Sequence, residues 1–242
     1  MNEEKTPKKK FSWRYLFAGI CFVLAALFFA ADPIRNMLLA QHQADYALTA
    51  QPVTAQEIKD NSQKDASFDF DKVESINLQN VVAAKLDTSN YLTVGAIAVP
   101  SVGMNLPIYR GLANEALLAG AGTMKPDQVM GEGNYALAGH HYPASPSVLF
   151  SPLMNLKVGD TIYITDLENI YEYKTETIDL VDIYQVHVVD DRPGETEITL
   201  VTCNDDATLR YIYKGKFVSK TPITQATKAM SDAFGIDLTT AY

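Results

Sequence analysis

The sequence has very few cysteines: Cys21 and Cys203 are the only two in 242 residues. Cys21 lies in an apolar run near the N-terminus, whereas Cys203 ends a strand-like segment far along the chain. If the first is in lipid and the second is not, they cannot pair, so we expect no disulfide framework. Ligands at zinc-site spacing are also missing. We therefore expect neither a metal nor a cofactor.

Basic residues are scarce outside the N-terminal segment. The net charge is −9, and residues 1–36 hold six Lys or Arg against three Asp or Glu, which leaves −12 on residues 37–242. A nucleic-acid binder needs cations that displace the counterions of the phosphate backbone. An acidic body of this size makes nucleic acid a poor partner, so we expect none.

Charged residues are absent from positions 15–31, which form a continuous apolar run. At about 1.5 Å per residue the run makes about 25 Å of helix, the short end of a membrane-spanning length. Lys and Arg gather before the run, and only Arg35 closely follows it. The positive-inside rule then places residues 1–14 in the cytoplasm and the rest outside the cell. A secretory signal cleaved near Ala31 is the alternative; the length of the run favours a retained single-pass anchor in the cell membrane.

Glycine is absent and proline is scarce from Asp32 to about Asp71. This composition favours a partly helical segment over a loose tether. We interpret residues 32–75 as an extracellular stalk that lifts the body off the membrane. Residues 76–220 then form the folded domain, and residues 221–242 form a C-terminal helix or tail.

Short β-type runs separated by turn residues follow from residue 92 onward. This spacing is typical of an all-β domain, a closed barrel or a sandwich. The predicted strands are 92–99, 104–109, 135–138, 161–165, 170–183, 198–203 and 210–219, and brief helices are predicted near 73–86, 114–119, 147–155 and 224–234.

Cys203 closes the segment 198–203, in which strand alternation puts Thr199, Val201 and Cys203 on one face. A single cysteine in a strand is ordinarily a small buried hydrophobe. Here it stands at the C-terminal end of the strand, directly before the polar loop 204–208. That position allows the sulfur to face a cleft, which makes Cys203 a candidate nucleophile.

Arg210 and His140 supply the other groups that cysteine acyl chemistry requires. Arg210 begins the next strand, and a hairpin would bring it to the same rim as Cys203. A guanidinium there stabilises a thiolate and donates to a forming oxyanion, although a surface arginine paired with Asp205 or Asp206 is the plainer interpretation. His140 follows an apolar strand and Gly139. It is either a satisfied structural histidine or the proton donor for a leaving amine.

Together these segments resemble the class A sortases of Gram-positive bacteria, on residues 137–140 (LAGH), residues 199–203 (TLVTC) and the following Arg210. Residues 120–125 (GAGTMK) and 149–153 (LFSPL) are similar to the streptococcal branch. The resemblance covers about residues 68–220 and the anchor. It implies an all-β fold: a closed eight-stranded β-barrel with short helices and a groove, preceded by a single N-terminal transmembrane helix.

The resemblance also implies a reaction on the LPxTG sorting signal of secreted proteins. Cys203 would attack the Thr–Gly carbonyl and form a thioester. His140 would protonate the departing glycine amine and then accept a proton from the amine of lipid II or a peptidoglycan peptide. Arg210 would hold the substrate and stabilise the oxyanion. The substrate-binding positions that the resemblance implies are Thr202, which shapes the site, and Ala138 and Val201, which line an apolar groove.

Two alternatives stay open at this stage. A related cysteine peptidase that transfers its acyl group to water would carry the same residues, and a membrane-tethered binding module would keep Cys203 buried and inert. No acidic cluster that would hold calcium stands out beside the loop 181–196, so we expect calcium independence. The resemblance also extends to sortases that polymerise pilins, whose lid carries an Asp-Pro-aromatic motif that plugs the site. Here Asp32 and Pro33 are followed by Ile34, so we expect housekeeping anchoring rather than pilin assembly.

Overall fold

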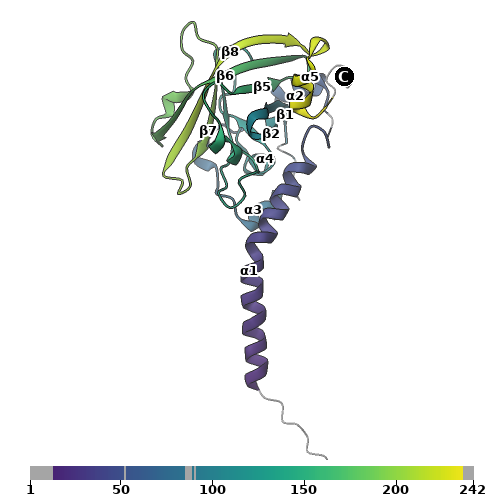
Figure 1. Ribbon diagram of the computed structural model, residues 1–242, viewed down its shortest axis with the longest axis vertical. Coiled ribbons are helices and arrows are strands. Elements are labelled where there is room, and N and C mark those ends of the chain that lie inside the picture. Colours follow the sequence, from purple (N-terminus) through teal and green to yellow (C-terminus); the bar gives the residue numbers. More distant parts are fainter. Residues whose placement is uncertain (1–12, 52, 85–88, 90, 237–242) are drawn as a thin grey trace, which may run out of the picture.

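The computed structural model describes residues 13–51, 53–84, 89 and 91–236. A long N-terminal helix, α1 (Trp13–Asp45), projects from a rounded body (Figure 1). The strands of the body close into one barrel in the order β1-β2-β3-β4-β7-β8-β6-β5. The closed eight-stranded barrel expected from the sequence is confirmed. The strands are β1 (Thr93–Val99), β2 (Met104–Tyr109), β3 (Ala121–Thr123), β4 (Asn134–Ala138), β5 (Thr161–Thr165), β6 (Asn169–Asp182), β7 (Glu197–Cys203) and β8 (Leu209–Pro222).

Most neighbouring strands are antiparallel, but β2 with β3 and β4 with β7 are parallel. Closure matters because it leaves no unpaired sheet edge. Side chains from every part of the barrel fill its interior, and Ile97, Ile108, Leu137 and Leu200 are among those with no exposed surface. Strand β3 was not predicted, because three residues that include a glycine give no alternation to detect.

Short helices cover the outside of the barrel and its loops. The α-helices after α1 are α2 (Ala55–Ser62), α3 (Leu78–Ala84), α4 (Asn114–Leu117) and α5 (Lys228–Phe234). The 3-10 helices are η1 (Phe70–Lys72), η2 (Pro100–Val102), η3 (Ser151–Asn155), η4 (Val186–Val189) and η5 (Ile223–Gln225). Helices α2 and α5 bury Ile58, Met230 and Phe234 against the outer face of β1, in one cluster with Ala96 and Ala98. This explains why β1 is apolar on both faces.

Several residues of the segment 32–75, interpreted from the sequence as a stalk, pack on the body. Helix α1 runs on to Asp45, and both Leu39 and His42 are fully buried. The His42 Nε2 atom lies 2.8 Å from the Tyr91 hydroxyl oxygen. Farther along, Leu48 is buried beside α2 and α5. The composition correctly indicated helix here, but composition does not reveal which surface a helix packs on.

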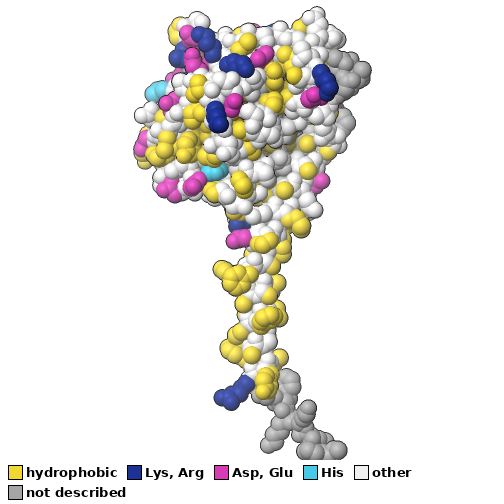
Figure 2. Space-filling model, in the orientation of Figure 1, with side chains coloured by type: hydrophobic (Ala, Val, Ile, Leu, Met, Phe, Trp, Pro, Cys, Tyr) yellow, Lys and Arg dark blue, Asp and Glu magenta, His cyan; other side chains and the backbone are white. Residues whose placement is uncertain are grey.

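The first half of α1 is the part that fits a membrane. Among the described residues, α1 is the one helix long and apolar enough to cross a bilayer by length and composition. Large side chains such as Trp13, Phe22 and Phe28 are at least three-quarters exposed, and hydrophobic side chains lie along the visible face of this half (Figure 2). Exposed apolar surface of this size needs an apolar environment. Residues 15–31 therefore form a candidate membrane anchor.

Candidate active site

The register of three strands brings the predicted site residues to one rim of the barrel. Cys203 at the end of β7 pairs directly with Arg210 near the start of β8. On the other side of β7, Ala138 of β4 pairs with Val201. The Gly139 N–H donates to the Val201 carbonyl at 3.1 Å, which carries the parallel pairing past the end of β4. His140, the next residue, thus leaves the sheet beside Cys203.

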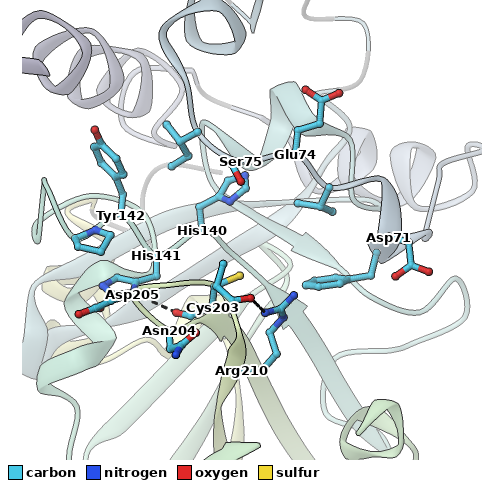
Figure 3. Close-up of a pocket in the computed structure, with 15 residues that line it drawn as sticks. Asp71, Glu74, Ser75, His140, His141, Tyr142, Cys203, Asn204, Asp205 and Arg210 are labelled. Atoms are coloured by element: carbon cyan, nitrogen blue, oxygen red, sulfur yellow. Dashed lines mark hydrogen bonds and ion pairs between the residues drawn. The ribbon is translucent and has the colours of Figure 1, made fainter. Parts of the chain in front are cut away.

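All three residues line one open pocket of about 440 Å³. In the view of Figure 3 the Cys203 sulfur lies between the His140 ring and the Arg210 guanidinium. Strands therefore position the thiol and the guanidinium, and a loop that directly follows a strand positions the imidazole. The sequence prediction that these three groups share an opening is met by this geometry. Other lining residues come from the loops, including Asp71, Glu74, Ser75, His141, Tyr142 and Asp205.

Gly139 is required for the placement of His140. A Cβ atom at this position would lie 2.5 Å from the Phe150 ring, closer than atoms approach without a shift. With no Cβ there, the Phe150 ring packs on the backbone, and the Phe150 N–H donates to the His140 carbonyl at 2.9 Å. The Thr202 hydroxyl donates to the Gly139 carbonyl at 2.7 Å. These contacts fix the turn from which the His140 side chain projects.

Burial keeps both reactive groups uncharged at neutral pH. It raises the pKa of the Cys203 thiol, and the positive charge of Arg210 offsets only part of that rise. It lowers the pKa of His140 to about 4, because an apolar environment disfavours the imidazolium. The resting pair is therefore a thiol and a neutral imidazole. A thiolate–imidazolium pair forms when the thiol proton moves to the ring.

Arg210 is held at the rim by its own loop and by an aromatic ring. Its Nη1 donates to the carbonyls of Ala207 and Leu209, each at 3.0 Å. Its Cζ atom lies 5.5 Å from the centroid of the Phe70 ring, within cation–π range. Among the described residues, Arg210 forms no ion pair with Asp205 or Asp206, which was the plainer interpretation of the sequence. Asp205 instead lies 3.6 Å from the His141 Nδ1 atom.

His141 has a different position from its neighbour. Its Nδ1 atom lies 3.1 Å from the backbone carbonyl oxygen of Cys203, and its side chain is 5% exposed. This contact ties the loop after β4 to the end of β7. Histidine at 141 thus supports the backbone of the cysteine, while His140 presents its ring to the pocket.

Three further residues were predicted to contact substrate, and all three are buried. Thr202 is 1% exposed, Ala138 3% and Val201 4%. None of them lines the pocket. Ala138 packs in an apolar cluster with Leu112 and Leu117, and Phe70, Val73 and Met124 pack against that cluster. Ala138 is therefore covered by this cluster, to which Phe70 and Val73 from the segment before the barrel contribute.

This covering segment, residues 67–76, is the part of the site that sequence reasoning missed; we call it the strap. The Leu112 N–H donates to the Ser67 carbonyl at 2.7 Å. Asn114 accepts from the Glu74 N–H at 2.8 Å and donates to the Lys72 carbonyl at 3.2 Å. Such bonds join positions about 40 residues apart and leave no local pattern. The strap forms one wall of the pocket.

Removal of the strap's ring from Arg210 should make the thiol more reactive. In a Phe70→Ala variant, water reaches the pocket and the guanidinium is released toward Cys203, so the pKa of the thiol falls. We expect alkylation of Cys203 by a methanethiosulfonate to become about two- to fivefold faster, since an exposed cation–π contact contributes about 0.5–1 kcal/mol. Phe68→Ala is the matched control, because Phe68 covers Arg110 at 5.4 Å. Equal rates for both variants would contradict the role given to Phe70.

Among the described residues, no group of three or more His, Cys, Asp or Glu is arranged to hold a metal ion. A closed barrel with a thiol, an imidazole and a guanidinium at one pocket has the groups of a cysteine enzyme of acyl transfer. Fold and site together define that class of protein.

Comparison with known proteins gives the family. The family model of the sortase domain matches residues 97–218. Sortase A of Streptococcus agalactiae serotype III (strain NEM316) is 36% identical over 226 residues, covering 91% of each chain. Sortase A of Listeria monocytogenes serovar 1/2a (strain ATCC BAA-679 / EGD-e) is 42% identical over 73% of this chain and 80% of the relative. The solved structure of Listeria monocytogenes sortase A is 44% identical, with a TM-score of 0.54 over 59% of this chain and 97% of that one.

The chain belongs to the sortase family and is a cysteine transpeptidase. The resemblance to class A sortases and to their streptococcal branch is confirmed. Membership of an enzyme family also removes the alternative of a non-enzymatic binding module.

Proposed function

We propose that Cys203 is the nucleophile, His140 the general acid and base, and Arg210 the group that stabilises the oxyanion. The single observation that carries this proposal is that the three side chains line one pocket at the junction of β4, β7 and β8. Thr202 supports the site by holding the Gly139 carbonyl. Ala138 and Val201 underlie the apolar surface on which the signal's Leu and Pro would bind once the strap moves.

The proposed substrate is the LPxTG signal of a secreted protein, cleaved between Thr and Gly. The thiol proton of Cys203 passes to His140, and the sulfur then attacks the Thr carbonyl carbon to form a C–S bond. Arg210, fixed by its bonds to the Ala207 and Leu209 carbonyls, donates from its other nitrogens to the oxyanion. His140 returns the proton to the glycine nitrogen as the C–N bond breaks. An incoming amine then attacks the thioester, gives a proton to His140, and releases the thiol.

The rate should depend on pH as a broad bell. Between about pH 4, the pKa of His140, and the raised pKa of Cys203, the neutral pair dominates. The reactive thiolate–imidazolium pair is then a small, constant fraction, so kcat/KM is flat and turnover is slow. Below that range the imidazole gains a proton while the thiol keeps its own, so the thiolate is lost. Above it the thiol loses its proton and the imidazole stays neutral, so the proton for the leaving amine is lost. The rate therefore falls on both sides. Initial-rate assays from pH 3.5 to 10.5 would reveal the acid and alkaline limbs of kcat/KM. A profile with a single limb would contradict the scheme with two titrating groups.

We further propose the arrangement of the chain in the cell. Residues 1–14 are cytoplasmic, residues 15–31 span the membrane, and the catalytic domain with its 76–220 barrel lies outside, followed by a C-terminal segment at 221–242. The excess of Lys and Arg before the span supports this orientation. The acceptor would be the amine of lipid II or of a peptidoglycan peptide. The LPxTG proteins, which donate the acyl group, would reach the enzyme on the extracellular side of the membrane.

Incubation of the full chain with an LPxTG peptide and an amine tests this function. We expect a product in which the peptide ends at Thr and carries the added amine, seen by mass spectrometry. If only the free carboxylate appears at saturating amine, the protein transfers to water and the acceptor proposal is wrong. A peptide with the Thr and Gly order reversed is the control for recognition of the signal.

A further inference from the structure

Beyond its apolar half, α1 packs directly on the loop that carries His140; we call residues 139–150 the histidine loop. The Asn36 side-chain amide donates to the Ala144 carbonyl at 3.0 Å. The Leu149 N–H donates to the Gln43 side-chain oxygen at 2.7 Å. The Arg35 Cζ atom lies 5.1 Å from the centroid of the Tyr142 ring. The catalytic loop is thus attached to the anchor helix itself.

A buried apolar cluster reinforces these polar contacts. Leu39 of α1 has no exposed surface and packs with Tyr142, Val148 and Leu149 of the histidine loop and with Val81 of α3. Truncation of a fully buried leucine in such a cluster is strongly unfavourable, because it leaves a cavity among packed side chains. The joint between helix and loop therefore resists rotation and separation.

The joint lies very close to the membrane. Asn36 follows Ala31, the last residue of the apolar run, by five positions, or about 7 Å of helix axis. The polar headgroup layer on one side of a bilayer is about 5–8 Å thick. Tyr142 and Pro143 line the catalytic pocket, and the Ala144 carbonyl accepts from Asn36. With residues 15–31 in a bilayer, one wall of the pocket would therefore stand at the height of the outer headgroups. Figure 1 shows that the body meets α1 beyond the projecting half of this helix.

The histidine loop is suited to lie against lipid headgroups. Residues 133–156 contain no Asp, Glu, Lys or Arg, in a chain whose net charge is −9. Pro143, Ala144, Pro146 and Ser147 are exposed on the loop. An uncharged surface approaches an anionic bilayer without the repulsion that acidic side chains would cause.

We infer that the histidine loop faces the bilayer surface, and that residues 32–45 of α1 are a positioning element that holds the pocket at the level of an amine carried by a lipid. This inference rests on the proposed transpeptidase function and on the anchor. A flexible tether of the same 14 residues would let the site range over about 20 Å. A fixed height instead raises the effective concentration of a lipid-borne acceptor at the thioester.

The location can be measured without any catalysis. The full chain, with Cys21 and Cys203 replaced by alanine, is placed in phosphatidylcholine–phosphatidylglycerol vesicles that contain a lipid with a spin-labelled headgroup. A fluorophore on Ser147→Cys should be quenched strongly. The same fluorophore on Ala229→Cys, an exposed position of α5 on the distal part of the body, should be quenched little. Equal quenching at the two positions would overturn the inference.

A test of the positioning role must raise the pocket above the membrane while the contacts between α1 and the histidine loop stay intact. An insert of roughly eleven helical residues between Ala31 and Asp32 adds three turns, about 16 Å, and restores the facing of the helix. We expect transfer to an amine coupled to phosphatidylethanolamine in the same vesicles to fall at least tenfold, and transfer to soluble dialanine to stay within twofold. The same insert before Phe11 is the control and should change neither rate.

The outcomes separate the two proposals. If the unmodified enzyme fails to transfer to soluble dialanine, the proposed function is wrong, and the quenching result still decides where the loop lies. If soluble transfer is normal and the lipid-linked amine reacts equally well with and without the insert, the positioning role of α1 is wrong and the transpeptidase assignment stands.

Discussion

Replacement of Cys203 by alanine should abolish transfer, lowering kcat/KM by about 10⁴-fold or more. The proposed reaction proceeds through a bond to sulfur, and the pocket holds no second thiol: His140 and His141 are imidazoles, and Ser75 carries a hydroxyl, which is a weaker nucleophile than a thiol. With an LPxTG peptide, mass spectrometry of the unmodified protein should show an acyl adduct on Cys203. The variant should show none.

The control for this variant is Cys21→Ala. Cys21 is exposed within the apolar half of α1, far along the helix from the pocket, so its removal should leave the rate within twofold. Cys203 is only partly buried, and loss of its sulfur should leave the melting temperature nearly unchanged. An acyl adduct that persists in the Cys203→Ala protein would remove the nucleophile assigned here.

The sequence predicted those parts of the site whose positions follow from strand alternation and from a local hairpin. Alternation in 198–203 and a hairpin to Arg210 are local features, and they correctly predict that Cys203 and Arg210 meet at one rim. The approach of His140 is a long-range feature. It depends on parallel pairing of β4 with β7, which the composition of neither strand specifies, so only the resemblance to a family supplied it.

The parts that escaped prediction are held by contacts between distant segments. The strap makes two hydrogen bonds with Asn114 and one with Leu112, and either residue alone looks like an ordinary loop position. The packing of parts of residues 32–75 on the body was not predicted, because a polar helix with isolated apolar residues resembles a solvated one. Leu39 and Ile58 are buried only because α3, the histidine loop and β1 supply their partners.

Burial at the site produces a conflict that the proposed chemistry must resolve. The same apolar surroundings that raise the pKa of Cys203 and lower that of His140 make the charge pair rare before substrate binds. They also strengthen each interaction with the developing oxyanion, because the local dielectric is low. The strap adjusts this balance, since Phe70 both excludes water and engages Arg210. Movement of the strap on substrate binding would then free the guanidinium when it is needed.

The imidazole can be tested against its neighbour. A His140→Asn variant should lose about 10³-fold in kcat/KM, because general acid–base catalysis contributes about 10²–10⁴-fold and asparagine cannot carry the proton to the leaving amine. The acid limb near pH 4 should also disappear, since it reports titration of His140. A purely structural role would lower activity without changing the shape of the pH profile.

His141→Asn is the matched comparison at the next position. Asparagine can still reach toward the Cys203 carbonyl, which the His141 Nδ1 atom contacts at 3.1 Å, so we expect a loss of less than tenfold with both limbs of the pH profile retained. The two histidines are adjacent and both line the pocket, but the His141 ring also lies against the Cys203 carbonyl oxygen. If the larger loss and the missing limb belonged to His141, the proton would travel through that ring, and the mechanism built on His140 would have to be reassigned.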